Sequence, residues 1–291
     1  MSILSEFEIK APELGVKNIL ILQNGEKIAE KHWDEEIRRN QYSVSKSFTC
    51  AAVGIAIHEH LLSLEEKICD AFPDEVPEEP NDFLKNLTVR HLLTMSIGQE
   101  KGHLMGAQRP FLETKDWVRY ALCQPFSFMP GEKFVYSNVG PYLAGILVQR
   151  RAGCNLIDYL MPRLFVPLGI LRPTWETDPE GNTFGAGGLF ICVSELARFM
   201  QLYLQNGSWN GRQLLSAKWV RESAQKQMEN GREGYGYLFW RGAGNSYRSD
   251  GKYGQYGIIV PDKQMVISIN SECIRQNELL ELIENTLFSK L

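Results

Sequence analysis

The feature that most constrains the fold is a predicted helix that is apolar on nearly all sides and carries a serine and a lysine at its head. It begins at Ser43-Val44-Ser45-Lys46 and continues to about residue 60 with small and apolar side chains. A helix that is apolar all round is a buried central helix. Ser43 and Lys46 are three residues apart and share one helix face. Burial lowers the pKa of a lysine, so Lys46 is a candidate base beside a candidate nucleophile, Ser43.

The Ser-x-x-Lys pattern occurs three times in the chain, and only the surroundings distinguish the copies. Residues 223–226 lie among charged and amide side chains that predict a solvated helix face. Residues 249–252 lie in a glycine-rich turn between strands, where helical spacing does not apply. We therefore assign the catalytic pattern to Ser43 and Lys46. The alternative is that Ser43 only caps the helix.

A second motif, Tyr136-Ser137-Asn138, follows a Pro-Gly turn at a predicted loop-to-helix junction. A phenol acts as a base at neutral pH only when a cation stabilises its anion or when its proton is relayed. Lys46 is the candidate cation. The amide of Asn138 offers an oxygen to Lys46 and a nitrogen to a substrate carbonyl. The alternative is a packed tyrosine followed by an asparagine that caps a helix.

A third element, Ser249-Asp250-Gly251-Lys252, stands near the end of the chain. Glycine allows a strand backbone to approach a ligand closely. We expect the N–H of Lys252 to form an oxyanion hole with the N–H of Ser43, which lies at a helix N-terminus and favours negative charge. The alternative is a plain glycine-rich hairpin loop.

Composition excludes several classes of protein. The chain of 291 residues favours one core with an inserted subdomain. A net charge of −4 without a basic cluster argues against a nucleic-acid partner. No apolar run approaches a membrane span, and the N-terminal residues lack the apolar centre of a signal peptide. The six cysteines lack metal-ligand spacing and predict buried free thiols in a reducing compartment.

We therefore expect a cytoplasmic protein with a small-molecule ester or amide as its substrate. We expect no membrane partner, no nucleic acid, no metal and no cofactor, and the oligomeric state stays open. The five histidines have no zinc-binding helix spacing, and a Gly-x-Ser-x-Gly elbow is missing from the sequence.

The pattern of strands and helices predicts an α+β fold. A β-hairpin is expected around Asn24-Gly25, because two β-rich runs flank this dipeptide. Strands are also predicted near the C-terminus, and helices between the two strand regions. The predicted strands are 235–240, 255–260 and 265–269, and the predicted helices are 113–123, 139–151, 156–164, 195–205 (capped by Ser194), 217–228 and 277–288. Strands at both ends predict an antiparallel sheet built from both termini and flanked by helices.

The same pattern predicts two parts. Residues 1–65 plus 186–291 form the expected sheet domain, and residues 66–185 form a mostly helical inserted subdomain. The active site is expected in the cleft between them.

The three ordered motifs resemble those of the penicillin-recognising serine hydrolases, in the branch of class C β-lactamases, related esterases and D-alanyl-D-alanine carboxypeptidases. Residues 87–93, 130–131, 167–169, 187–189 and 197–199 also resemble this branch, and the likeness covers about residues 17–270. The resemblance implies a β-lactamase/transpeptidase-like fold. It also implies Ser43 as nucleophile, Lys46 and Tyr136 as the proton-handling pair, and Asn138 as a contact of the substrate and of the lysine.

One motif departs from this family pattern. Members that bind β-lactams well carry Lys-Thr-Gly or His-x-Gly where this chain has Ser249-Asp250-Gly251. A negative charge about 4 Å from a substrate carboxylate costs about 4 kcal/mol at an effective dielectric of 20. The side chain of Lys252 is expected on the other face of the strand, where it does not compensate.

The sequence thus predicts a serine hydrolase that forms an acyl-enzyme on an ester or amide and is weak on β-lactams. The alternatives are a non-catalytic ligand-binding protein with a β-lactamase-like fold, and a D-Ala-D-Ala carboxypeptidase.

Overall fold

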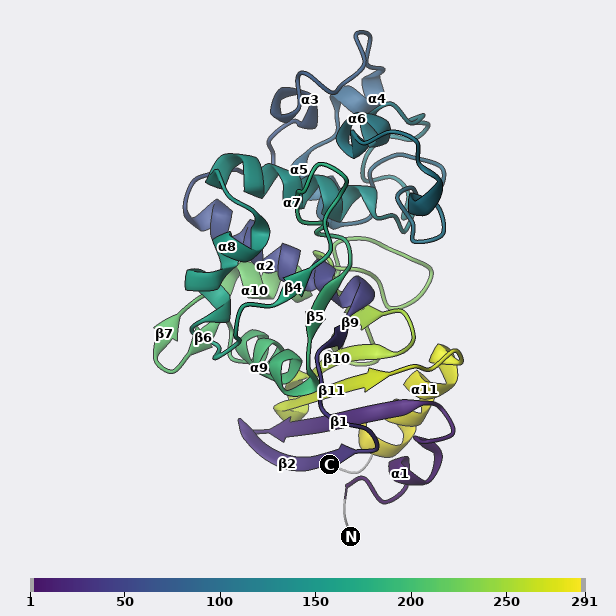
Figure 1. Ribbon diagram of the computed structural model, residues 1–291, viewed down its shortest axis with the longest axis vertical. Helices are drawn as coiled ribbons and strands as arrows, with labels where there is room; N and C mark the ends of the chain where they lie inside the picture. Colours follow the sequence, from purple (N-terminus) through teal and green to yellow (C-terminus); the bar gives the residue numbers. More distant parts are fainter. Residues whose placement is uncertain (1–2, 289–291) are drawn as a thin grey trace.

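The structure is a computed structural model, and it describes residues 3–288. Its largest sheet has six antiparallel strands in the order β2-β1-β11-β10-β9-β8. The strands are β1 (Val16–Gln23), β2 (Glu26–His32), β8 (Trp240–Arg241), β9 (Tyr247–Gly251), β10 (Gln255–Val260) and β11 (Met265–Ser271). β1 pairs with β11, so the two ends of the chain meet in the middle of the sheet (Figure 1). This confirms the predicted α+β fold and the sheet built from both termini.

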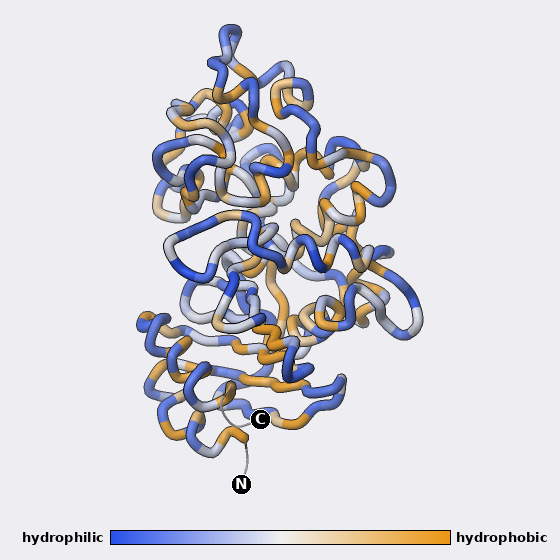
Figure 2. Tube along the Cα trace, turned by 180° about the vertical axis from the view of Figure 1, so that it is seen from behind, coloured by the Kyte–Doolittle hydropathy of each residue, from blue (hydrophilic) through white to orange (hydrophobic). Residues whose placement is uncertain are grey.

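Helices cover both faces of this sheet. Helix α9 (Val193–Leu204) packs on one face, where Leu20 contacts Val193 and Ala197. Helices α1 (Phe7–Lys10) and α11 (Gln276–Ile283) cover the other face, where Phe7, Leu279 and Ile283 pack on the isoleucines of β1 and β11. Strands covered on both faces read as nearly continuous apolar runs, and Figure 2 shows hydrophobic colour along these strands.

The remaining helices form the other end of the molecule and its centre (Figure 1). They are α2 (Ser45–His58), α3 (Ile68–Ala71), α4 (Asp82–Lys85), α5 (Val89–Leu93), α6 (Trp117–Leu122), α7 (Val139–Ala152), α8 (Leu156–Leu160) and α10 (Ala217–Ala224). Helix α2 is buried along nearly its whole length, as predicted. One hydrophobic cluster joins Phe48 of α2, Leu143 of α7 and Phe199 of α9, so both parts share a core. The division into domains at residues 65 and 186 stays a prediction.

A second, small sheet was not predicted. It consists of β3 (Arg39–Asn40), β5 (Leu189–Ile191) and β4 (Thr174–Trp175), in the order β3-β5-β4. A further hairpin joins β6 (Ser208–Trp209) to β7 (Arg212–Gln213). Strands of two or three residues are too short to show a period of two in the sequence. The small sheet matters because it holds the segment before Ser43 against the segment after Gly188.

The predicted strand 235–240 is wrong for most of its length. The N–H of Tyr237 donates to the Ser223 carbonyl at 3.0 Å, and Leu238 has a positive φ of 57°. This segment therefore runs along the end of α10, and only its last residue, Trp240, belongs to a strand, β8. The aromatic side chains of the segment are buried in the core, which gives its sequence the pattern of a strand. Residues 235–239 nevertheless form no strand of the sheet.

Several helix bounds also differ from the prediction. Helix 217–228 ends at Ala224, and helix 113–123 shortens to α6. Helices 156–164 and 277–288 each continue as a π-helical turn, at Met161–Phe165 and Glu284–Phe288. Helix α9 is capped by Cys192 instead of Ser194. Frayed or tightened ends of this kind depend on tertiary contacts more than on local propensity.

None of the helices in residues 3–288 combines the length and the apolarity that a membrane crossing requires. The six cysteines are free thiols. Only Cys50 and Cys273 are fully buried, and Cys123 is exposed, so the expectation of burial is wrong for the others.

Candidate active site

Ser43 lies in a tight turn just before the buried helix. The sequence predicts that the helix begins at Ser43, but residues Tyr42–Val44 form a 3-10 turn and α2 begins at Ser45. Tyr42 has a positive φ of 47°, and its N–H donates to Oδ1 of Asn40 at 2.7 Å. Ser45 Oγ donates to the Tyr42 carbonyl at 2.6 Å. The turn holds the Ser43 hydroxyl at the wall of a cavity.

Lys46 is buried, and its amine contacts the candidate nucleophile. Nζ lies 2.8 Å from Ser43 Oγ and donates to the Ala186 carbonyl at 2.6 Å. Burial, and secondarily the positive charge of Arg109, lower the pKa of Lys46 to about 7. A large fraction of the amine is therefore neutral near pH 7, and a neutral amine accepts the proton of the Ser43 hydroxyl.

The glycine-rich segment 185–189 supplies the carbonyl that holds Lys46. Thr49 Oγ1 of α2 donates to the Gly185 carbonyl at 2.7 Å, and the N–H of Leu189 donates to Ser45 Oγ at 3.0 Å. A Cβ on Gly185 would lie 2.8 Å from Thr49 Oγ1. The lack of a side chain at Gly185 thus lets the segment dock closely on α2.

Tyr136 completes the predicted trio. The Lys46 amine lies 5.1 Å from the centre of its ring, and the ring stacks on Trp240 with centroids 5.5 Å apart. Burial raises the pKa of Tyr136 well above its usual value, and a hydrogen bond with Ser43 opposes the shift only in part. The phenol is therefore protonated at neutral pH. The sequence-predicted residues Ser43, Lys46 and Tyr136 are brought together in one site.

The predicted hydrogen bond between Asn138 and Lys46 is not formed. Nδ2 of Asn138 donates one of its two hydrogens to the Leu104 carbonyl at 2.9 Å. Oδ1 is buried and has no hydrogen-bond partner among residues 3–288. The hydrogen bonds of Lys46 go to Ser43 and Ala186 instead of to this oxygen. Asn138 lines the cavity and offers an acceptor there.

The third motif divides between two faces of strand β9. Asp250 and Lys252 line the cavity, whereas Ser249 points away from it and donates to the Gly257 carbonyl at 3.3 Å. The predicted substrate contact of Ser249 is therefore wrong. Lys252 was expected on the other face of the strand, and this placement is wrong, because Lys252 lies in the turn after β9 and lines the cavity.

Gly251 permits a close approach, but to the chain itself instead of to a ligand. A Cβ on Gly251 would lie 2.3 Å from the Gln41 carbonyl oxygen. Strand β9 therefore lies directly against the segment that leads into Ser43. This contact brings the backbone at residue 252 to the side of the cavity where Ser43 stands.

Asp250 of this motif forms an ion pair that the sequence did not lead us to predict. Arg248 Nε pairs with Asp250 Oδ2 at 3.0 Å. Burial raises the pKa of Asp250, and Arg248 opposes the shift. Since Arg248 and Asp250 are two residues apart in one strand, the period of two would have predicted this pair.

The cavity has a volume of about 550 Å³ and is lined by both polar and apolar side chains. Its lining residues come from eight separate stretches of the chain: Asn40, Tyr42, Ser43, Met105, Gly106, Arg109, Tyr136, Asn138, Glu176, Phe184, Ala186, Gly187, Gly188, Trp240, Asp250, Lys252, Tyr253 and Gln276. Two of them, Arg109 and Glu176, form an ion pair at 3.3 Å. They are distant in sequence, since Arg109 begins the 3-10 helix Arg109–Phe111 and Glu176 directly follows β4, so no local pattern would have identified them.

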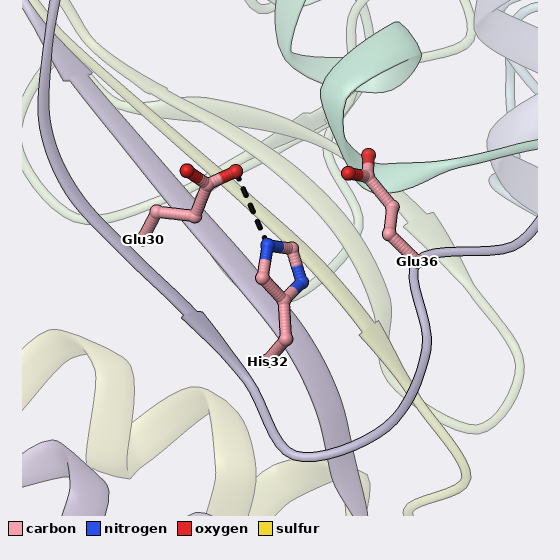
Figure 3. A group of neighbouring side chains, drawn as sticks. All are labelled: Glu30, His32 and Glu36. Carbon is pink, nitrogen blue, oxygen red and sulfur yellow. Dashed lines mark ion pairs between the residues drawn. The ribbon is translucent and has the colours of Figure 1, made fainter.

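One group of residues outside the cavity resembles a metal site. Glu30, His32 and Glu36 offer ligand atoms within 4.8 Å of one another, beside the edge strand β2 (Figure 3). His32 Nδ1 lies 3.0 Å from Asn18 Nδ2 and accepts its hydrogen bond, so Nε2 carries the proton that faces Glu30 at 3.2 Å. Exposed ion-paired side chains explain this cluster, and we assign no metal to it.

Comparison with known proteins shows the family and the fold of this chain. The family model Beta-lactamase matches residues 18–273. A penicillin-binding protein 4* of Bacillus subtilis (strain 168) is 28% identical over 135 residues, which are 44% of this chain and 28% of that protein. A fimbrial assembly protein FimD of Dichelobacter nodosus is 32% identical over 117 residues, which are 38% of this chain and again 28% of the relative. The chain thus spans well under half the length of these relatives.

Solved structures share the fold over nearly the whole chain. EstCE1, described as a hydrolase with promiscuous acyltransferase activity, superposes with a TM-score of 0.81 and 14% identity over 99% of both chains. An octameric penicillin-binding protein homologue from Pyrococcus abyssi gives a TM-score of 0.79 with 20% identity, over 98% of this chain and 76% of that one. These similarities establish the β-lactamase/transpeptidase-like fold. The match of the family model over most of the sequence shows that this chain belongs to the beta-lactamase family.

Proposed function

We propose that this protein is a serine hydrolase that cleaves an ester or amide through an acyl-enzyme on Ser43. The observation that carries the proposal is the 2.8 Å contact between Ser43 Oγ and the buried amine of Lys46. A serine hydroxyl needs an adjacent base to become a nucleophile, and an amine with a pKa of about 7 suits this role at neutral pH.

The proposed reaction has two halves. Ser43 Oγ gives its proton to Lys46 Nζ and bonds to the substrate carbonyl carbon, while the N–H groups of Ser43 and Lys252 hold the oxyanion. The leaving group takes a proton from the Tyr136 hydroxyl, and the Lys46 ammonium returns a proton to the phenolate as the C–O or C–N bond breaks. Water then attacks the carbonyl carbon of the acyl-enzyme and gives a proton to Lys46. Lys46 passes this proton to Ser43 Oγ as the bond between Oγ and the acyl carbon breaks, which releases the acid and free Ser43.

Opposite pKa shifts support different roles for Lys46 and Tyr136. Both were candidates for the base, but the pKa of Tyr136 is raised by burial and that of Lys46 is lowered. Lys46 is therefore the better acceptor for the proton of Ser43, and the protonated phenol is the better donor to the leaving group.

We expect β-lactams to be poor substrates. Asp250 lines the cavity at the position where related enzymes present a cation and a hydroxyl to the substrate carboxylate. Arg248 does not replace that cation, because it is paired with Asp250. A relative named D-alanyl-D-alanine carboxypeptidase keeps peptide cleavage as a second candidate. Side-by-side assays with p-nitrophenyl esters, nitrocefin and D-Ala-D-Ala peptides decide between these substrates.

The test of the mechanism is covalent labelling. A fluorophosphonate should add its mass to Ser43 of the wild-type protein, and Ser43→Ala should lose both the label and ester turnover. Ser208→Ala, in the β6–β7 hairpin, serves as the matched control and should keep both. A folded wild-type protein that takes up no label and hydrolyses no ester would support the non-catalytic ligand-binding alternative. Turnover retained in Ser43→Ala would reject the mechanism.

A further inference from the structure

Arg109 lines the cavity, and the hydrogen-bonding capacity of its guanidinium is largely unused. Arg109 and Glu176 form an ion pair through Nη1 and Oε2 at 3.3 Å. Oε1 of Glu176 accepts a second hydrogen bond from Asn40 Nδ2 at 3.2 Å. Both oxygens of the carboxylate therefore have partners.

The guanidinium is in the opposite situation. An arginine has five N–H donors, and Glu176 engages only one nitrogen of Arg109. Nε of Arg109 is buried without a hydrogen-bond partner among residues 3–288. The group lies 4.3 Å over the ring of Phe184, which restricts its plane. An oriented, half-buried guanidinium with unused donors is a binding site for a planar anion.

Arg248, the other arginine beside the cavity, is different. Its Nε pairs with Asp250 at 3.0 Å, and its Nη1 donates to the Arg241 carbonyl at 3.3 Å. Asp250 repels an anion on the side of strand β9. Lys252 is a further cation of the cavity, and its amine lies 4.7 Å from the centre of the Tyr253 ring. Arg109 differs from both because it begins the 3-10 helix Arg109–Phe111, far in sequence from the strand motif, and presents a planar guanidinium with unused donors.

We propose that Arg109 is a specificity-determining residue that binds a carboxylate of the substrate. This inference rests on the proposed serine hydrolase function and names its substrate class, an ester or amide that carries a carboxylate group apart from the reacting carbonyl. Glu176 holds the guanidinium in place when the cavity is empty and competes with the substrate for it.

Matched pairs of esters test the proposal. Mono-p-nitrophenyl glutarate and its methyl ester differ only in a charge on the acyl part, and 3-carboxyphenyl acetate and phenyl acetate differ in a carboxylate on the leaving group. The wild-type protein should prefer the charged member of one pair by about 10-fold or more in kcat/KM, since hydrogen bonds between charged groups are the strong ones. Arg109→Gln should abolish this preference, and Glu176→Gln should increase it. Arg212→Gln removes a surface charge on β7 and should leave the preference as in the wild type.

A second readout shows whether Arg109 faces the catalytic amine. The charge of Arg109 lowers the pKa of Lys46, so Arg109→Gln should move the acidic limb of the kcat/KM profile for phenyl acetate to higher pH. A structural role alone would leave this limb in place. No preference for either charged ester in the wild type, or a preference that survives Arg109→Gln, would overturn the proposal.

Binding separates this inference from the proposed function. Monomethyl glutarate should bind to the Ser43→Ala protein, and the double variant with Arg109→Gln should bind it about 10-fold more weakly. If no ester is hydrolysed but this binding difference holds, the catalytic proposal fails and the carboxylate site stands. If esters are hydrolysed and the two proteins bind the ligand equally, only the carboxylate site is rejected.

Discussion

Lys46 Nζ lies 2.8 Å from Ser43 Oγ, although the two residues belong to different helical segments. Ser43 is in the 3-10 turn Tyr42–Val44, and Lys46 is in the first turn of α2. The tighter turn places the hydroxyl at the cavity wall while the amine stays buried below it. The pair thus combines a hydroxyl at the cavity wall, the proposed nucleophile, with a buried amine, the proposed base.

Replacement of Lys46 should nearly remove turnover. Lys46→Met keeps the length of the side chain but cannot accept the proton of Ser43, so kcat/KM should fall by about 10²–10⁴-fold. Steady-state kinetics with a p-nitrophenyl ester measure the loss. Lys218→Met, on the exposed face of α10, is the control and should retain wild-type kinetics. A loss of less than 10-fold in Lys46→Met would argue that another group is the base.

The same substitution should change the pH dependence of stability. The pKa of Lys46 is about 7 in the folded protein, whereas the ordinary pKa of a lysine is 10.5. Between these values the unfolded chain binds more protons, so the stability of the wild type rises with pH relative to that of Lys46→Met. Between pH 6 and pH 9 the gain should be roughly 2–3 kcal/mol. Urea unfolding of both proteins at each pH measures it, and parallel curves would contradict the lowered pKa.

The activity of the wild type should itself depend on the ionisation of Lys46. As pH rises through about 7, the amine loses its proton and becomes a base, so kcat/KM for a neutral ester should rise and then level off. A pH–rate profile from pH 5 to 9 checks this expectation. A rate that is flat across this range, or that falls with pH, would rule out Lys46 as the base.

Tyr136→Phe should lower the rate without moving this pH limb. Burial keeps the phenol protonated through neutral pH, so its removal takes away a proton donor and leaves the titration of Lys46 largely unchanged. We expect kcat to fall by about 10²–10³-fold for an ester with a poor leaving group. The loss should be smaller for p-nitrophenyl esters, because p-nitrophenolate leaves without a proton. Equal losses for both kinds of ester would speak against general-acid catalysis by Tyr136.

Gly251→Ala should damage both stability and activity. The new Cβ would lie 2.3 Å from the Gln41 carbonyl oxygen, two residues before the nucleophile. Relief of this contact requires movement of β9 or of the turn, at a cost of about 1–3 kcal/mol in unfolding free energy. A Cβ on Gly106 meets nothing within 4 Å, so Gly106→Ala should change stability by less than about 0.5 kcal/mol. Chemical denaturation compares the two variants, and equal stabilities would show that the strand adapts freely.

The sequence by itself determined the parts of this protein that depend on local pattern. The apolar run after Lys46 predicted the buried helix α2, and the alternation around Asn24-Gly25 predicted the β1–β2 hairpin. Ser43, Lys46 and Tyr136 were found because their residue types and spacing are specific in combination. These features follow from helical and strand periods, which act over a few residues.

Tertiary structure decided what depends on contacts between distant segments. Arg109 and Glu176 form the charged pair of the cavity, although they lie in two segments that no helical or strand period connects. The side-chain amide of Asn138 donates to the backbone carbonyl of Leu104, a residue far from it in the sequence. The segment before Trp240 has the composition of a strand but packs against the end of α10 instead. In each case burial and hydrogen bonding across the fold outweigh local propensity, because their free energies are larger than the preferences of single residues.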